Sequence, residues 1–276
     1  MTIKLIAADM DGTLLDSRSQ IPPGLFELIT RLHDRGIRFA AASGRQYYNL
    51  LKLFEPVKDK MVFIAENGGM VFEGEKELFV QNIPADDLRN IVNLARSIPD
   101  AYTLICGTLA AYSQDNQPQF MGNAAKYYAH LELIPEQFAR LGSEEFCKVA
   151  VFHNDAEHYV LPVMKQLENN FLVSLSGVNW VDVMRKGVNK GTAIRRIQSM
   201  LNITPDETMA FGDYMNDLEM MKECRYSCAV ANAHPDLKAH CNYQLALSND
   251  EYGVIKVLNK LLEKPENQFS GEWFAV

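Results

Sequence analysis

Asp9 and Asp11 stand two residues apart in the segment DMDGTL, which occupies residues 9–14. An apolar run over residues 3–8 precedes them and suits a strand that is buried on both faces. Two carboxylates this close repel each other unless a cation offsets their charge, and Mg²⁺ takes oxygen ligands from a small number of carboxylates. The segment therefore indicates a cation site at a strand end. An ordinary turn is the alternative, because aspartate and glycine both favour turns.

A hydroxyl, backbone amides and a lysine occur at two other expected boundaries between elements. Ser43 and Gly44 follow a predicted strand at 38–42 and precede a helix, an arrangement that suits an anion. Lys190 begins a predicted helix at 190–201, where a lysine opposes the helix dipole and is often placed for a ligand. Each feature also has an ordinary explanation, since serine caps helices and lysine is common on surfaces.

Further polar groups come after a predicted strand at 208–211. Asp213 leaves this strand as a potential metal ligand, while Asn216 and Asp217 begin the next helix, where helix capping would also explain them. Ligands of open α/β sheets lie beyond the carboxyl ends of the strands. We therefore expect the four segments to meet at one edge of one sheet. Together they supply the charge neutralisation and positioning that phosphoryl transfer needs.

The elements that hold these segments alternate in type at both ends of the chain. Strand, helix, strand, helix and strand follow one another up to residue 65, and the alternation returns after residue 186, which is typical of a doubly wound parallel sheet. We predict an α/β protein in which residues 1–82 and 187–276 form a Rossmann-like core domain. Residues 83–186 are expected to form an inserted α+β cap domain.

The inserted region has a different pattern, in which short turns join the strands and indicate an antiparallel sheet. Its strands are expected at 102–106, 110–114 and 148–152 and as a pair around 176–179, and its helices at 86–97, 124–130 and 156–169. Just before it, residues 70–72 and 78–80 are expected to form a hairpin.

The composition is that of a globular protein and excludes several classes. The chain has 276 residues, 47% of them hydrophobic, and a net charge of −8. An acidic chain has no broad attraction for nucleic acid or anionic lipid, so neither is expected as a partner. No apolar run approaches the roughly 18 residues of a membrane span, and the start does not resemble a signal peptide. The five cysteines suggest no disulfide framework; we expect them to be buried thiols in a reducing cytoplasm.

As a set, the four segments resemble the haloacid dehalogenase superfamily, specifically its Cof-type sugar-phosphate phosphatases with a large inserted cap. The resemblance covers nearly the whole chain and rests on DMDGTL, on SGR at 43–45, on the lysine of GVNKG at 187–191 and on GDYMND at 212–217. It implies that Asp9 is the nucleophile and Asp11 the general acid and base. It also implies that Asp9, the backbone carbonyl of Asp11 and Asp213 hold Mg²⁺.

The resemblance further implies a phosphate site and residues around it. The phosphate would be held by Ser43, the Gly44 amide, Lys190, Asn216 and the backbone of Met10. Asp217 would steady Lys190 or a metal-bound water, and Gly12 and Thr13 would support the turn after Asp11. Arg45 and Asn67, on loops of the core domain near the mouth of the site, are predicted substrate contacts.

The insert is expected to close over the site and to select the leaving group. Within it, Asn123, Lys126, Asn179 and Trp180 are possible substrate contacts, although each residue type is more typical of surface or core at its position. The six histidines form no metal-binding spacing and are interpreted as structural. The tail at 264–276 carries Phe269, Trp273 and Phe274, which are candidates for docking on the protein or on a partner.

The sequence favours a Mg²⁺-dependent phosphatase that acts on small phosphorylated metabolites, most of all sugar phosphates, through an aspartyl phosphate. A phosphomutase with the same nucleophile is one alternative, and a bisphosphate requirement would distinguish it. A signalling receiver that accepts a phosphoryl group on aspartate is another, although receivers lack a long insert. A catalytically idle binding module is a third. The sequence does not indicate an oligomeric state.

Overall fold

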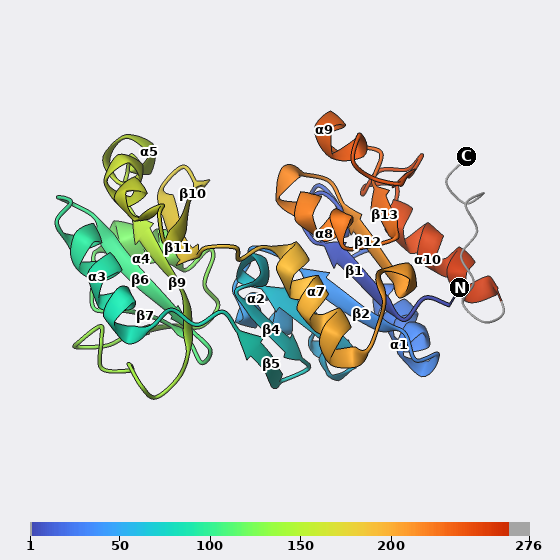
Figure 1. Cartoon of the computed structure of the whole chain (residues 1–276), viewed down its shortest axis with the longest axis horizontal. Helices are drawn as coiled ribbons and strands as arrows, with labels where there is room; N and C mark the ends of the chain where they lie inside the picture. The colour runs from blue at the N-terminus through green and yellow to red at the C-terminus, as the bar shows by residue number, and fades with distance from the viewer. Residues whose placement is uncertain (1, 265–276) are drawn as a thin grey trace. The chain divides into compact units, whose positions relative to one another are not determined.

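The computed structural model describes residues 2–264, and the aromatic tail residues named above lie outside this range (Figure 1). The chain forms two compact units. The first comprises Met1–Gly44, Leu50–Leu78 and Asn189–Val276, and the second comprises Arg45–Asn49 and Phe79–Val188. The short segment Arg45–Asn49 thus belongs to the same unit as the inserted region, from which it is distant in sequence. The domain boundaries at 82/83 and 186/187 stay a prediction.

The first unit is built on a sheet with the strand order β14-β13-β12-β1-β2-β3-β4-β5. The strands are β1 (Leu5–Asp9), β2 (Arg38–Ala42), β3 (Met61–Ala65), β4 (Met70–Glu73), β5 (Lys76–Val80), β12 (Thr208–Gly212), β13 (Tyr226–Ala229) and β14 (Tyr243–Gln244). Pairing is parallel from β14 to β3, and β4 runs antiparallel to β3. The central strands β1, β3 and β12 are buried along their whole length and mostly apolar, as expected for strands covered on both faces.

Helices cover this sheet and bury apolar faces, such as Leu25, Leu28, Ile29 and Leu32 of the first one. The helices are α1 (Leu25–Asp34), α7 (Lys190–Leu201), α8 (Leu218–Lys222), α9 (Pro235–Lys238) and α10 (Gly253–Glu263), with single turns at Glu55–Lys60, Glu66–Gly68, Pro205–Glu207 and Met215–Asp217. A further helix, α2 (Tyr47–Leu53), belongs to this unit only from Leu50 onward. α1 packs against α10, whereas α7 packs against α8 and lies in front of the sheet in Figure 1. Burying each leucine-sized side chain of such a face contributes about 1.5–3 kcal/mol. The predicted α/β fold is confirmed.

The second unit holds a smaller sheet with the order β10-β11-β9-β6-β7-β8. Its strands are β6 (Tyr102–Gly107), β7 (Ala111–Ser113), β8 (Leu131–Leu133), β9 (Phe146–Phe152), β10 (Phe171–Gly177) and β11 (Trp180–Arg185), and its helices are α3 (Ala85–Arg96), α4 (Pro118–Ala124), α5 (Ala156–Tyr159) and α6 (Leu161–Met164). All pairs are antiparallel except β7 with β8. Leu88 and Ile91 of α3 pack with Val149 and Val151 of β9 in the buried core.

Two predicted helices of the insert are wrong in extent. The one expected at 156–169 is divided into α5, α6 and a final single turn at Lys165–Leu167. Pro162 lies at the division, and proline lacks the N–H that a continuous helix needs. The helix expected at 124–130 ends at Ala124, and a loop leads from there to β8.

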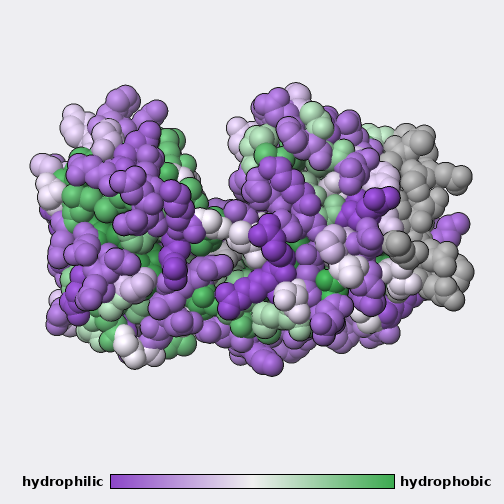
Figure 2. Space-filling model, in the orientation of Figure 1, coloured by the Kyte–Doolittle hydropathy of each residue, from purple (hydrophilic) through white to green (hydrophobic). Residues whose placement is uncertain are grey.

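The surface and the cysteines mostly follow the composition. Hydrophilic residues cover much of the viewed face of each unit (Figure 2). All five cysteines are free thiols, and four are buried. Cys241 is only half-buried, so the prediction of a buried thiol is wrong there. None of the helices among residues 2–264 has the length and apolar character needed to cross a membrane.

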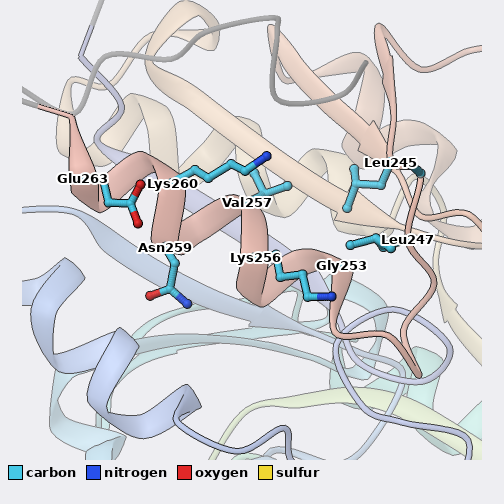
Figure 3. A pocket seen from close by; sticks show the side chains of 9 residues that line it. Leu245, Leu247, Gly253, Lys256, Val257, Asn259, Lys260 and Glu263 are labelled. Atoms are coloured by element: carbon cyan, nitrogen blue, oxygen red, sulfur yellow. The ribbon is translucent and has the colours of Figure 1, made fainter. Parts of the chain in front are cut away.

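A cavity of about 300 Å³ lies beside α10. Its lining combines apolar side chains with the lysines of one helix face: Leu245, Ala246, Leu247, Gly253, Lys256, Val257, Asn259, Lys260 and Glu263. Figure 3 shows Lys256 and Lys260 on α10, with Leu245 and Leu247 on the segment that precedes the helix. None of these residues belongs to the motifs described above.

Candidate active site

Three carboxylates meet at the carboxyl ends of neighbouring strands in the first unit. Asp9 is the last residue of β1, and Asp213 follows β12, which pairs with β1 in parallel. Asp217 ends the single turn after β12. Carboxylate oxygens of the three residues all lie within 4.8 Å of one another. The register of the sheet therefore gathers acidic groups from distant parts of the chain, as expected for a ligand site of an open α/β sheet.

Lys190 is the cation that faces this cluster. It is the first residue of α7, and its side chain is fully buried. Its ammonium donates hydrogen bonds to Asp9 Oδ1 and, over 2.7 Å, to Asp217 Oδ1. The helix begins at this point because Asn189 caps it, accepting a hydrogen bond from Thr192 N at 2.8 Å. Capping thus places an ammonium group at a buried helix start. The helix dipole disfavours a positive charge there, and the carboxylates of Asp9 and Asp217 offset this cost.

Burial and charge shift the pKa of these groups in opposite directions. Burial raises the pKa of Asp9 well above its usual range, and Lys190 only partly opposes this effect. The pKa of Asp213 is also raised, chiefly by burial, while a hydrogen bond from Thr13 acts the other way. Burial lowers the pKa of Lys190, but Asp217 and Asp9 outweigh it, so the net shift is upward. The ammonium therefore stays charged, and it only partly offsets the cost of burying the carboxylates as anions.

The turn after Asp9 is held against the same cluster. Gly12 has a φ of +83°, and a Cβ atom there would collide with the Asp213 carboxylate. Thr13 Oγ1 donates to Asp213 Oδ1 at 2.9 Å. Asn232 Nδ2 donates to the Gly12 carbonyl at 2.7 Å, and Asn249 Nδ2 donates to the Leu15 carbonyl at 2.9 Å. A glycine is required here because both the backbone angle and the close approach exclude a side chain.

Ser43 and Gly44 follow β2, the strand on the other side of β1. Ser43 is buried, and its carbonyl accepts a hydrogen bond from Asn67 N at 2.9 Å. Asn67 has a φ of +51°, a left-handed conformation that costs roughly 1 kcal/mol or more for a residue with a side chain. The Asn67 side chain lies beside Gly44, so a Cβ there would come within 3.0 Å of Asn67 Nδ2.

The other predicted site residues are placed as follows. Met10 is fully buried, and its carbonyl accepts hydrogen bonds from the amides of Leu14 and Leu15. Asp11 is exposed, two residues beyond Asp9, and Asn216 is exposed in the single turn that Asp217 ends. Arg45 is half-buried and belongs to the second unit.

The donor set suits a hard divalent cation. Asp9, Asp213 and Asp217 offer oxygen atoms, the ligand type that Mg²⁺ prefers. Lys190 balances one of the three charges, and a divalent cation would offset the remainder. Among residues 2–264, these three form the group of His, Cys, Asp or Glu side chains with metal-binding proximity. A Mg²⁺ ion could therefore be held here.

Asn232, Asn249 and Asn189 support the site but were not singled out from the sequence. Asn232 and Asn249 also contact each other, since Asn249 N donates to Asn232 Oδ1 at 3.1 Å. Both lie in loops far from the four motifs, where asparagine is a common turn residue. The sequence around Asn189 does indicate a helix cap, because Asn189 precedes a predicted helix and has a threonine three residues later.

The chain matches a family model described as haloacid dehalogenase-like hydrolase over residues 6–258. It is 32% identical over 268 residues to the 5-amino-6-(5-phospho-D-ribitylamino)uracil phosphatase of Escherichia coli. The aligned region covers 95% of this chain and 97% of the relative. It is 25% identical to the HMP-PP phosphatase of Yersinia pseudotuberculosis, over 98% of this chain and 99% of the relative.

Two solved structures have a similar fold over nearly the whole chain. A Streptococcus mutans protein superposes with a TM-score of 0.79 at 30% identity, covering 95% of this chain and 100% of the other. A Thermotoga maritima protein superposes with a TM-score of 0.83 at 22% identity, covering 94% and 97% of the two chains, which shows a shared fold.

Proposed function

The chain belongs to the haloacid dehalogenase-like hydrolase family and is a phosphatase of that family, and we propose that it hydrolyses small phosphorylated metabolites through a transient aspartyl phosphate on Asp9. One observation carries the proposal: Asp9 lies buried at a strand end, in hydrogen-bond contact with the ammonium of Lys190 and among two further carboxylates. A nucleophilic carboxylate beside fixed positive charge is what transfer of a phosphoryl group to aspartate requires.

In the first step, a carboxylate oxygen of Asp9 attacks phosphorus while the bond between phosphorus and the leaving oxygen breaks. Lys190 offsets charge on the phosphoryl oxygens, and Asp217 holds the ammonium in place through its 2.7 Å hydrogen bond. Because Asp217 Oδ2 also accepts from Asp213 N at 3.1 Å, the ammonium and the metal-binding carboxylates share one rigid support. Fixed charge in a buried site stabilises a charged transition state without reorganisation.

Asp11 serves as the acid and base of the two steps. It gives a proton to the leaving alkoxide, and it then takes a proton from the water that attacks the phosphorus of the aspartyl phosphate and releases inorganic phosphate. Its exposed position two residues beyond the nucleophile supports this role, since leaving group and water must both reach it. General acid–base catalysis of this kind is worth about 10²–10⁴-fold.

The phosphate seat is formed by Ser43, the Gly44 amide, Lys190, Asn216 and the Met10 backbone, with Gly12 and Thr13 keeping the turn in place. Mg²⁺, held by Asp9, Asp213 and the Asp11 carbonyl, supplies charge neutralisation when it is bound. The additional proximity of Asp217 supports a cation site in this cluster. Arg45 and Asn67 contact the part of the substrate beyond the phosphate.

The substrate class is a small phosphate ester, such as a sugar or polyol phosphate. Matched relatives are named for a phosphoribitylaminouracil and for HMP-PP, both small phosphorylated metabolites. Relatives named as phosphatases favour release of phosphate to water over its return to a reoriented intermediate.

Replacing Asp9 by asparagine tests the nucleophile. Asp9→Asn is expected to lower the rate of phosphate release from a panel of metabolite phosphates by about 10³-fold or more, because the amide cannot form the acyl phosphate. The matched control Asp34→Asn changes an exposed aspartate of the same unit and is expected to leave the rate unchanged. A folded Asp9→Asn enzyme with undiminished turnover would reject the assignment.

Removing Mg²⁺ tests the cation site independently of turnover. Mg²⁺ at 100 times its dissociation constant is expected to stabilise the folded protein by about 2.7 kcal/mol, seen as a higher melting temperature that chelation reverses. Asp213→Asn is expected to lose most of this response. An equal response to Mg²⁺ in both proteins would place the ion elsewhere.

A further inference from the structure

The segment Arg45–Asn49 directly follows the proposed phosphate seat in the chain, yet it belongs to the second unit. Two of its side chains, Gln46 and Asn49, end in amides that pair with the backbone of the loop at 127–130. We refer to these two residues as the amide clamp. This loop is the region where the sequence predicted a helix and the structure has none.

Gln46 makes a two-point contact with a single residue of this loop. Its Nε2 donates to the His130 carbonyl at 2.8 Å, and its Oε1 accepts from His130 N at 3.0 Å. The glutamine is 5% exposed, so water does not compete freely for these groups. The His130 carbonyl also accepts from Ala111 N of β7 at 3.0 Å, which ties Gln46 to the sheet of the second unit.

Asn49 repeats this arrangement one turn later. Its Nδ2 donates to the Tyr127 carbonyl at 3.0 Å, and its Oδ1 accepts from Ala129 N at 2.6 Å. Between the two amides, Tyr48 Oη donates to the Thr108 carbonyl at 3.0 Å. Donor and acceptor of both amides are used, so neither side chain can rotate without losing hydrogen bonds, each worth about 1 kcal/mol net.

We propose that the amide clamp positions Arg45 for the substrate and thereby determines which phosphate esters are turned over efficiently. Arg45 lies in the chain between Gly44 of the phosphate seat and Gln46 of the clamp, so the clamp limits where its backbone can lie. Holding the backbone of a ligand-binding segment in place before binding reduces the entropy that binding costs. Gln46 and Asn49 are positioning residues in this proposal, which rests on the proposed function.

Two substrates separate positioning from general damage. p-Nitrophenyl phosphate has little beyond its phosphate for Arg45 to hold, whereas the best metabolite phosphate from the panel has a polar leaving group. Gln46→Ala is expected to raise the KM for the metabolite about 10-fold and to change turnover of p-nitrophenyl phosphate less than about 2-fold. Gln46→Glu keeps the acceptor for His130 N, so its KM for the metabolite is expected to lie between those of the native protein and of Gln46→Ala.

A double-mutant cycle tests whether the clamp acts through Arg45. In an Arg45→Ala background, Gln46→Ala is expected to cause no further rise in the KM, because the group that it positions is gone. Amide hydrogen exchange is expected to become faster at Ala129 and His130 in the Gln46→Ala, Asn49→Ala protein. Additive effects of Arg45→Ala and Gln46→Ala on the KM would overturn the proposal.

The matched control is Gln137→Ala. Gln137 is a buried glutamine of the same unit, and its Nε2 donates to the Thr103 carbonyl at 3.0 Å. Its loss is expected to lower the melting temperature and to leave the ratio of kcat/KM values for the two substrates unchanged. If Gln46→Ala lowers kcat/KM equally for p-nitrophenyl phosphate and for the metabolite while Asp9→Asn still abolishes turnover, the inference fails and the proposed function stands. If Asp9→Asn keeps turnover, the proposed function itself fails.

Discussion

Each unit of the protein buries a lysine against aspartate, but the balance of charge differs. In the first unit, Lys190 is fully buried among Asp9, Asp213 and Asp217, so acidic groups exceed the ammonium. In the second unit, Lys148 on β9 faces Asp182 on the neighbouring β11, with 3.3 Å between Nζ and Oδ2. Removing charges from water is costly unless they are matched. The excess of carboxylates therefore indicates a ligand site, and the matched pair indicates a structural role.

The two lysines also differ in where their elements place them. Lys148 lies within a strand whose neighbour carries its partner, and it is also 5.3 Å from the ring centre of Tyr128. Lys190 lies at a helix start, where the dipole disfavours a cation. A lysine at a helix start is unfavourable for the helix itself and is stabilised here only by the carboxylates of the site. Such a departure from local preference is typical of a functional residue.

The largest expected effect comes from Lys190→Met. Removing the ammonium leaves Asp9 and Asp217 buried without their partner, which is expected to destabilise the fold by about 3–5 kcal/mol and to abolish phosphate release. The double variant Lys190→Met, Asp217→Leu is expected to recover part of this stability but no activity. Urea unfolding and a phosphate-release assay measure the two quantities separately. Recovery of turnover in the double variant would show that the ammonium is only structural.

A smaller effect is expected from the equivalent changes in the second unit. Lys148→Met leaves the buried Asp182 without its cationic partner and is expected to cost about 1–3 kcal/mol, while phosphate release per folded molecule persists. Lys148→Met, Asp182→Leu is expected to regain most of that stability, because an apolar pair of similar volume can replace a matched ion pair. A loss of turnover in this folded double variant would break the distinction between the two units.

The smallest effect is expected at an exposed pair, His158 with Asp155, whose Nδ1 and Oδ1 atoms are 2.8 Å apart. A hydrogen bond to Asp155 raises the pKa of His158, so its contribution to stability is present at low pH and lost as pH rises through that pKa. The same hydrogen bond lowers the pKa of Asp155, so its contribution is lost as pH falls through that pKa.

Asp155→Asn keeps a side chain that can cap α5 but removes the charge. The melting temperature of this variant is therefore expected to differ most from that of the native protein at pH values between the pKa of Asp155 and the pKa of His158. Above the pKa of His158 the difference is expected to vanish. An equal difference at every pH would attribute the effect to capping instead of charge.

Much of the fold follows from local patterns. The bounds of β2 and α7 coincide with those predicted, because apolar runs and helix periodicity are properties of neighbouring residues. The short strands β8 and β14 were not predicted, since two or three residues carry little pattern. The predicted helix over 124–130 is wrong because the loop at 127–130 is held by Gln46 and Asn49, which are about eighty residues away in the sequence.

The sequence by itself determined the alternation of elements, the polar residues at the strand ends and the resemblance to a phosphatase family. These depend on residue type and on spacing along the chain. Only the tertiary structure decided that Lys190 contacts Asp9 across 181 residues of sequence, that Asp217 joins Asp9 and Asp213, and that Arg45 belongs with the inserted unit. Such contacts depend on strand order and register, which arise when the whole sheet packs.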